Sequence, residues 1–160
     1  MRLVALVFLI VALCGCATKP LVISDSSRFA AEGSAFEGRA TAYVIRDLED
    51  APGIHWPTHA MLDGVEKGVL FRGSYTRFAV APGRHVVVAH WNRALSSIPE
   101  VAVDSDFETG KTYYFVVSND IPVGVGWIEF QSFLRLADPR AGARMVRRFD
   151  DRTPAVAKQR

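Results

Sequence analysis

The chain has two cysteines, Cys14 and Cys16, and none after position 16. A domain beyond that point cannot form an internal disulfide, so it must be stable through packing alone. Long apolar runs are also scarce. The run at residues 3–13 (LVALVFLIVAL) is shorter than the roughly 20 residues with which a helix crosses a bilayer. Residues 38–137 lack a helical period between their β-type segments, which argues against alternating β and α units.

The start of the chain carries a secretory pattern. Arg2 is the only charged residue among the first sixteen, the apolar run follows it, and small residues end the segment. This order is typical of a signal peptide. The exit Leu13-Cys14-Gly15-Cys16 resembles the lipobox of bacterial lipoproteins, with Cys14 where alanine or serine is usual. The resemblance implies that residues 1–15 are removed and that Cys16 carries a thioether-linked diacylglycerol and an N-linked acyl chain such as palmitate. An ordinary signal peptide with two incidental cysteines is the alternative.

Several acyl chains anchor a protein stably, because each buried methylene contributes about 0.8 kcal/mol, whereas a single chain binds marginally. Residues 17–18 contain no aspartate, the residue that commonly retains lipoproteins in the inner membrane. We therefore predict an outer-membrane lipoprotein that faces the periplasm. Residues 16–37 are dominated by small and polar side chains without an apolar period, and we interpret them as the lipidated cysteine and a flexible tether.

From residue 38 the sequence changes to short segments rich in β-branched and aromatic residues. The most prominent lie at residues 39–46, 75–80, 84–91, 112–118 and 126–136. Turn signals separate them, including Asp63-Gly64, a strong hairpin signal, and Pro82-Gly83, which suits a type II turn. Seven or eight short strands at this spacing predict a mainly β domain over residues 38–137. An antiparallel β-sandwich is the favoured architecture, with an open barrel as the alternative.

One amphipathic helix is predicted at residues 138–150. Asp138 can cap its first turn, and Pro139 suits its first position. Residues 140–160 hold seven basic and two acidic residues, a net charge of +5. The arginines among them could bind anionic lipid, lipopolysaccharide or an acidic partner, or they could face water while the apolar arc of the helix packs on the sandwich. Residues 151–160 contain Pro154 and no period, and we interpret them as a disordered tail.

Patterns for catalysis and metal binding are weak. His55 and His59 have the spacing of a helical zinc site, but Pro57 between them disfavours a helix. His85 and His90 lie five residues apart on one expected strand, which places them on opposite faces. No serine lies in a strand–turn–helix elbow of the G-x-S-x-G kind. We therefore predict no enzymatic activity, no metal site, no cofactor and no nucleic-acid partner.

Binding residues are better candidates. Residues 48–59 (LEDAPGIHWPTH) form a long connection, and long loops on small β domains are often functional. Alternatively, Trp56 folds back over the open edge of the core. Trp127 and the aromatic run at residues 113–115 suit packing better than a glycan platform. The residues predicted to contact a partner or ligand are His55, Trp56, Trp127, Arg144, Arg147 and Arg148.

Four motifs, spread over residues 38–136, carry a family resemblance. They are AYVIR at 42–46, LDG at 62–64 with GVL at 68–70, GSY at 73–75 with PGRH at 82–85, and GKTYYF at 110–115. In this order and spacing they resemble a family of uncharacterised bacterial lipoproteins known only as a domain of unknown function. The resemblance implies a compact β-sandwich without an established activity, and it transfers no catalytic residue.

Two functional hypotheses follow. The first is a non-catalytic binding or scaffold module of the cell envelope, which engages a protein partner through exposed loops or a strand edge. The second is a module that binds cell-wall glycan or lipopolysaccharide through Trp56 and the C-terminal arginines. A hydrolase is a third and less favoured alternative. Because salt screens exposed charges, binding carried by the arginines should weaken steeply with ionic strength.

Overall fold

The computed structural model describes residues 21–22, 26–48, 56–91, 100–120, 123–124, 127–128 and 131–154. The expected signal peptide and Cys16 lie outside this range. Within it, no helix has the length and apolar character needed to cross a membrane.

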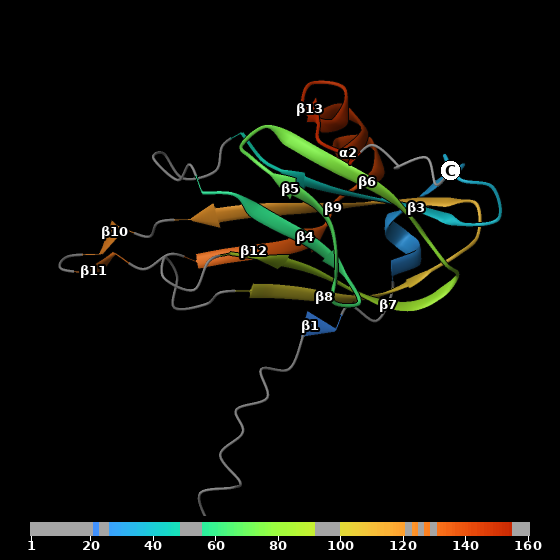
Figure 1. The fold of residues 1–160 in the computed structure, drawn as a ribbon, viewed down its shortest axis with the longest axis horizontal. Helices are drawn as coiled ribbons and strands as arrows, with labels where there is room; N and C mark the ends of the chain where they lie inside the picture. The colour runs from blue at the N-terminus through green and yellow to red at the C-terminus, as the bar shows by residue number, and fades with distance from the viewer. Residues whose placement is uncertain are drawn as a thin grey trace, which may run out of the picture.

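The described chain forms two main β-sheets packed face to face, with one α-helix on the outside of the second (Figure 1). In spatial order, the first sheet contains β1 (Leu21–Val22), β8 (Glu100–Phe107), β7 (Gly83–His90), β4 (Thr58–Leu62) and β5 (Val65–Leu70). The second contains β12 (Gln131–Leu136), β9 (Lys111–Asp120), β3 (Ala40–Arg46), β6 (Ser74–Val80) and β13 (Asp150–Asp151), with β2 (Ala30–Glu32) paired to the start of β9. A separate pair joins β10 (Val123–Gly124) to β11 (Trp127–Ile128). The predicted mainly β, two-layer architecture is confirmed.

The prediction of a purely antiparallel fold is wrong at the centre of the second sheet. There β3 runs parallel to β9, from the pair Thr41–Thr112 to the pair Arg46–Val117. Their neighbours β6 and β12 pair with them in the antiparallel sense. Sequence patterns indicate where strands and hairpin turns lie. Strands β3 and β9 are separated by several strands of both sheets, so no local pattern indicates whether they pair in the parallel or the antiparallel sense.

Alternate side chains from both sheets fill the core. Phe107, at the end of β8, joins the two layers, since its ring centroid lies 4.8 Å from that of Tyr113 and 6.0 Å from that of Phe115. Tyr114, one residue out of phase, points to the outer face and stacks on Tyr43 with centroids 5.1 Å apart. The two-residue period of a strand thus sends one tyrosine of the Tyr113-Tyr114 pair inward and the other outward.

The two ends of the sandwich differ. Short turns join β4 to β5, β6 to β7 and β8 to β9 at one end, which we call the turn end. The predicted Asp63-Gly64 hairpin is confirmed there, with φ of 49° and 79°, as a two-residue turn of this kind requires. At the other end, the loop end, the chain leaves β3, β7 and β9 for the longer connections at residues 47–57, 91–99 and 121–130, and the short turn at residues 71–73 joins β5 to β6.

The predicted C-terminal helix exists but is shorter than expected. Helix α2 spans Pro139–Val146, and the carboxylate of Asp138 accepts hydrogen bonds from the amides of Arg140 and Ala141 at 3.0 and 3.1 Å. After the helix, the chain forms β13, and Arg152 N–H donates to the carbonyl of Tyr75 at 2.7 Å. Residues 150–154 are therefore part of the second sheet and its edge, rather than helix or disordered tail.

The prediction of a flexible tether is wrong for residues 26–37. The 3₁₀ helix η1 (Ser26–Phe29) is joined to β8 through the Ser26 hydroxyl, which donates to the Asp106 carbonyl at 2.7 Å. Strand β2 follows and pairs with β9. The small, polar composition of this segment suggested a loose chain, but its backbone is held by pairing with sheet edges that are distant in sequence.

Candidate functional site

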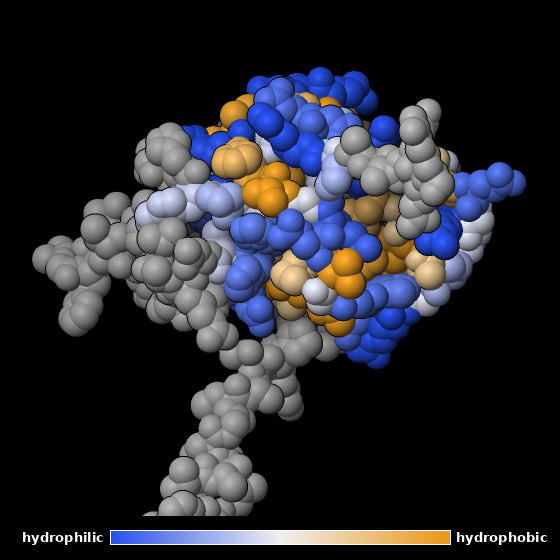
Figure 2. All heavy atoms as spheres, viewed as in Figure 1, coloured by the Kyte–Doolittle hydropathy of each residue, from blue (hydrophilic) through white to orange (hydrophobic). Residues whose placement is uncertain are grey.

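Three large apolar side chains are exposed at the loop end. Leu48 is 44%, Trp56 36% and Phe71 45% exposed, and we call these three residues the loop-end cluster. The strand pair Thr58–Leu70 brings Trp56 and Phe71 to the same end, because Trp56 lies just before Thr58 and Phe71 just after Leu70. Leu48 follows the end of β3, and its carbonyl accepts a hydrogen bond from Arg72, next to Phe71. On the face shown in Figure 2, apolar residues form separate patches among polar ones.

The backbone around this cluster is held by arginines. Arg46, the last residue of β3, is fully buried, and its guanidinium donates to the carbonyl of Trp56. Arg72 donates to the carbonyl of Leu48, and the Leu48 side chain lies against Gly73, where an added Cβ would be 2.6 Å from it. A buried charge is tolerated only where hydrogen bonds compensate its loss of water. Arg46 thus holds the backbone just before β4 in place from inside the fold.

Arg152 lies at the rim of the cluster. The Arg152 guanidinium lies 5.8 Å from the centre of the Phe71 ring, a distance at which a cation is attracted to an aromatic face. Its Nη2 atom lies 3.7 Å from the carboxylate of Asp150. The site therefore combines apolar contact area with guanidinium groups.

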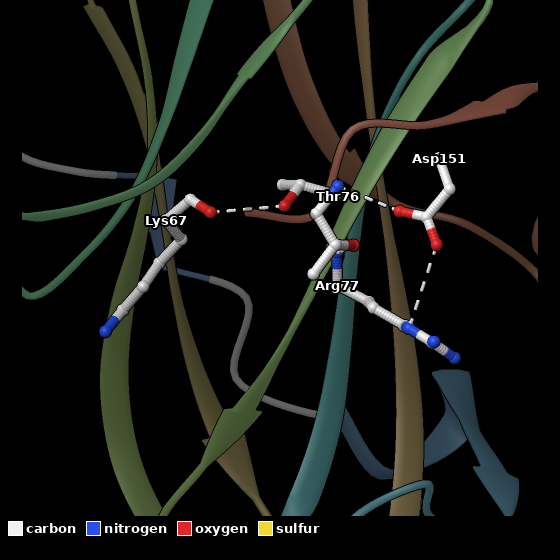
Figure 3. Close-up of polar contacts among 5 residues, drawn as sticks. Lys67, Thr76, Arg77 and Asp151 are labelled. Carbon is white, nitrogen blue, oxygen red and sulfur yellow. Dashed lines mark hydrogen bonds and ion pairs between the residues drawn. The ribbon is translucent and has the colours of Figure 1, made fainter. Parts of the chain in front are cut away.

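A groove lies along the open side of the sandwich between β5, β6 and the C-terminal segment. Its volume is ≈ 690 Å³, and its lining includes Phe36, Lys67, Phe78 and Pro154. Figure 3 shows the polar contacts at its edge: Thr76 Oγ1 donates to the Lys67 carbonyl at 3.2 Å, and Arg77 Nε lies 3.9 Å from Asp151 Oδ2.

Asp151 is tied into this edge. Burial raises the pKa of the Asp151 carboxyl, but hydrogen bonds from Thr153 and Tyr75 and the charge of Arg77 outweigh burial, so the pKa lies below its ordinary value. Thr153 also accepts a hydrogen bond from the amide of Arg77 at 2.9 Å. The polar groups of the groove edge therefore hold the C-terminal segment on β6.

The predicted arginines face solvent, with Arg144 on α2 and the other two just after its last residue. Arg144, Arg147 and Arg148 are exposed, and with Ala141 and Met145 they line a groove of ≈ 290 Å³. On its inner side the helix contacts β9 through Gly142, which is buried against Tyr114. The helix thus packs on the sheet while its arginines remain free to meet a charged surface.

The other predicted contact residues are described in part or not at all. His55 lies outside the described residues. Trp127 lies in β11, where its backbone pairs with that of Gly124, and the structure describes only its backbone.

The described histidines each lie near a carboxylate. His85 and His90 are on opposite faces of β7, as predicted: His85 packs on Phe107 and contacts Asp63 at 2.6 Å, whereas His90 faces His59 of β4. The pairing of His59 with His90 is not predicted by the sequence, because β4 and β7 are adjacent in the sheet but not in the chain. In the described part of the chain, no group of three or more His, Cys, Asp or Glu side chains is placed to hold a metal ion.

Comparison with known proteins gives no relative to guide the interpretation. No family model matches the chain. No curated protein matches it, and no solved structure does either. The functional argument therefore depends on the residues and geometry described above.

Proposed function

We propose that this chain is an outer-membrane lipoprotein of a bacterial envelope, and that its β domain is a non-catalytic binding or scaffold module for a protein partner. The signal-peptide pattern of residues 1–15 and the lipobox ending in Cys16 support the anchor.

The anchor would hold the domain near the bilayer. Strand β1 begins at Leu21 and pairs with β8, so four residues lie between it and Cys16, and five Cα–Cα steps join the two. An extended chain covers at most about 3.6 Å per residue, which keeps β1 within about 18 Å of the lipidated cysteine. A partner would therefore be engaged close to the membrane surface.

The loop-end cluster is the observation that carries the proposed binding function. Leu48, Trp56 and Phe71 leave apolar surface in water at one end of the domain, with Arg72 and Arg152 beside them. Aromatic residues and arginine are enriched among the residues that dominate binding energy in protein interfaces. The hydrogen bonds of Arg46 and Arg72 to this backbone limit the conformational entropy that binding would cost.

In-cell photo-crosslinking tests this proposal. A photo-reactive residue is placed at position 48, 56 or 71 and, as a matched control, at Val65, which is 57% exposed at the turn end. We expect a discrete protein adduct from the loop-end positions, none from position 65, and loss of the adduct in Cys16→Ala. Equal labelling from both ends, or no adduct from any loop-end position, would contradict the proposal.

A second candidate, binding of lipopolysaccharide or cell-wall glycan, is favoured by the arginine-lined groove on α2. Three exposed guanidinium groups beside Ala141 and Met145 suit a ligand with anionic groups next to apolar chains. For this candidate we expect the purified protein to be retained on lipopolysaccharide, and retention to fall with salt and in an Arg144, Arg147 and Arg148→Ala triple variant. Retention that neither change affects would exclude these arginines.

Hydrolase activity is not part of this proposal. Turnover of an envelope substrate by the purified protein, abolished by one point substitution, would overturn the non-catalytic assignment.

A further inference from the structure

Two histidines lie opposite each other on the outer face of the first sheet. His59 of β4 and His90 of β7 are direct register partners, and their ring centroids are 6.2 Å apart with an interplanar angle of 60°. Their side chains are 35% and 36% exposed, so an ion from solvent can reach both rings. Because both side chains project from paired strands, the sheet fixes their spacing without help from a loop.

A carboxylate lies beside Nδ1 of each ring. Glu66 Oε2 is 2.7 Å from Nδ1 of His59, and Glu100 Oε2 is 3.8 Å from Nδ1 of His90. The hydrogen bond to Glu66 favours the tautomer of His59 with its hydrogen on Nδ1, which leaves the lone pair on Nε2, and the nearby negative charge of Glu100 favours the same tautomer at His90. No residue in the described ranges forms a hydrogen bond with either Nε2 atom.

This is the arrangement in which histidine binds metals, with one ring nitrogen as ligand and the other oriented by a carboxylate. We propose that His59 and His90 together bind one divalent transition-metal ion of the class that prefers imidazole (Cu²⁺, Ni²⁺ or Zn²⁺) through their Nε2 atoms. Glu66 and Glu100 orient the rings and contribute negative charge, and water completes the coordination. The site is open, with two ligands from the protein.

The spacing requires a small adjustment of the rings. A metal–nitrogen distance near 2.0–2.1 Å places two imidazole centroids about 5 Å apart at the tetrahedral angle of Zn²⁺, and about 4.5 Å apart at the right angle of a tetragonal Cu²⁺ or Ni²⁺ site. The observed separation of 6.2 Å reaches these values when the two exposed rings move toward each other by about 1–2 Å in total. The backbone of β4 and β7 does not need to move.

Cu²⁺ binding by the full-length protein, purified from membranes in detergent, tests the proposal, since Cu²⁺ binds nitrogen sites most tightly of these ions. The variants are His59→Gln and His90→Gln, which retain a polar side chain. The matched control is His85→Gln, because His85 also contacts a carboxylate, that of Asp63, but lies on the other face of the sheet. In the processed lipoprotein Cys14 is removed and the sulfur of Cys16 is a thioether, so no free thiol competes for copper in any of the variants.

We expect one Cu²⁺ per chain, with two-imidazole nitrogen coupling in the electron paramagnetic resonance spectrum. Each of the two variants should weaken binding at least tenfold and remove one nitrogen, whereas His85→Gln should bind like the wild type. Glu66→Gln should weaken binding tenfold or more, in line with the usual effect of such supporting groups. Unchanged affinity in both His59→Gln and His90→Gln, or an equal loss in His85→Gln, would overturn the site.

Discussion

Gly142 of α2 lies directly on the ring of Tyr114 in β9. A Cβ at position 142 would be 2.3 Å from Cγ and 2.4 Å from Cβ of the tyrosine, closer than two carbon atoms can approach. The helix therefore depends on this glycine for its distance from the second sheet.

Gly142→Ala should destabilise the protein by about 1–3 kcal/mol, the usual cost of overpacking. In a helix without this contact, alanine would instead stabilise the protein by about 1 kcal/mol. The sign of the change in the free energy of unfolding therefore tells whether the contact is present. Urea unfolding measures the change. Arg144→Ala, on the exposed side of the same helix, is the control and should change the free energy of unfolding by less than about 0.5 kcal/mol. A more stable Gly142→Ala protein would show that the helix does not pack this closely.

Arg46→Met should cost about 1–3 kcal/mol, because the carbonyl of Trp56 loses a charged donor inside the fold. The loop-end cluster should also become more mobile, seen as weaker amide protection from hydrogen exchange at positions 56 and 58. Arg39→Met, an exposed arginine at the turn end, is the matched control. Equal protection at these two amides in Arg46→Met and the wild type would show that Arg46 does not hold this backbone.

Stability should fall on acidification below about pH 4. Burial raises the pKa of Asp63, but hydrogen bonds from Val86 and His85 outweigh it, and the pKa lies below its ordinary value of 3.8. A hydrogen bond from Arg84 lowers the pKa of Asp104 in the same direction. A carboxyl whose pKa is lower in the folded state contributes stability above its unfolded pKa, and this is lost as the pH falls through the folded value.

Asp63→Asn should therefore flatten the dependence of the urea midpoint on pH between about pH 4 and pH 2. Glu108→Gln, an exposed change at the turn end, serves as the comparison. If Asp63→Asn and the wild type lose stability with the same slope, the Asp63 contacts do not persist in solution.

Cys16→Ala should release the protein from the membrane fraction and remove the mass of the lipid from its N-terminus. Cys14→Ser should leave both unchanged, because residue 14 lies before the expected cleavage site. Mass spectrometry of the two variants after membrane fractionation measures this. A Cys16→Ala protein that stays in the membrane with the same N-terminal mass would exclude the lipid anchor.

Local features of the fold could be predicted because their causes are local. Asp63-Gly64 forms the expected hairpin since these residues adopt positive φ, and Asp138 caps α2 since its carboxylate reaches the free amides of the first turn. The alternation at Tyr113 and Tyr114 follows from the geometry of a single strand. The loop containing Trp56 was identified as a candidate from its length and composition, and the exposed tryptophan belongs to the loop-end cluster.

Partners that are distant in the chain could not be predicted. The parallel pairing of β3 with β9, the attachment of residues 26–37 to sheet edges and the burial of Arg46 each depend on segments brought together from far apart. The same holds for His59 and His90, which are register partners on two strands that are not consecutive in the chain.

The sequence by itself determined the secretory pattern, the β character of the domain, its turns and the start of its helix, because each arises from interactions within a few residues. Only the tertiary structure decided which strands are neighbours, which side chains gather at the loop end and which histidines face each other. These relations depend on the burial of two apolar sheet faces against one another, which involves residues that are distant in the sequence.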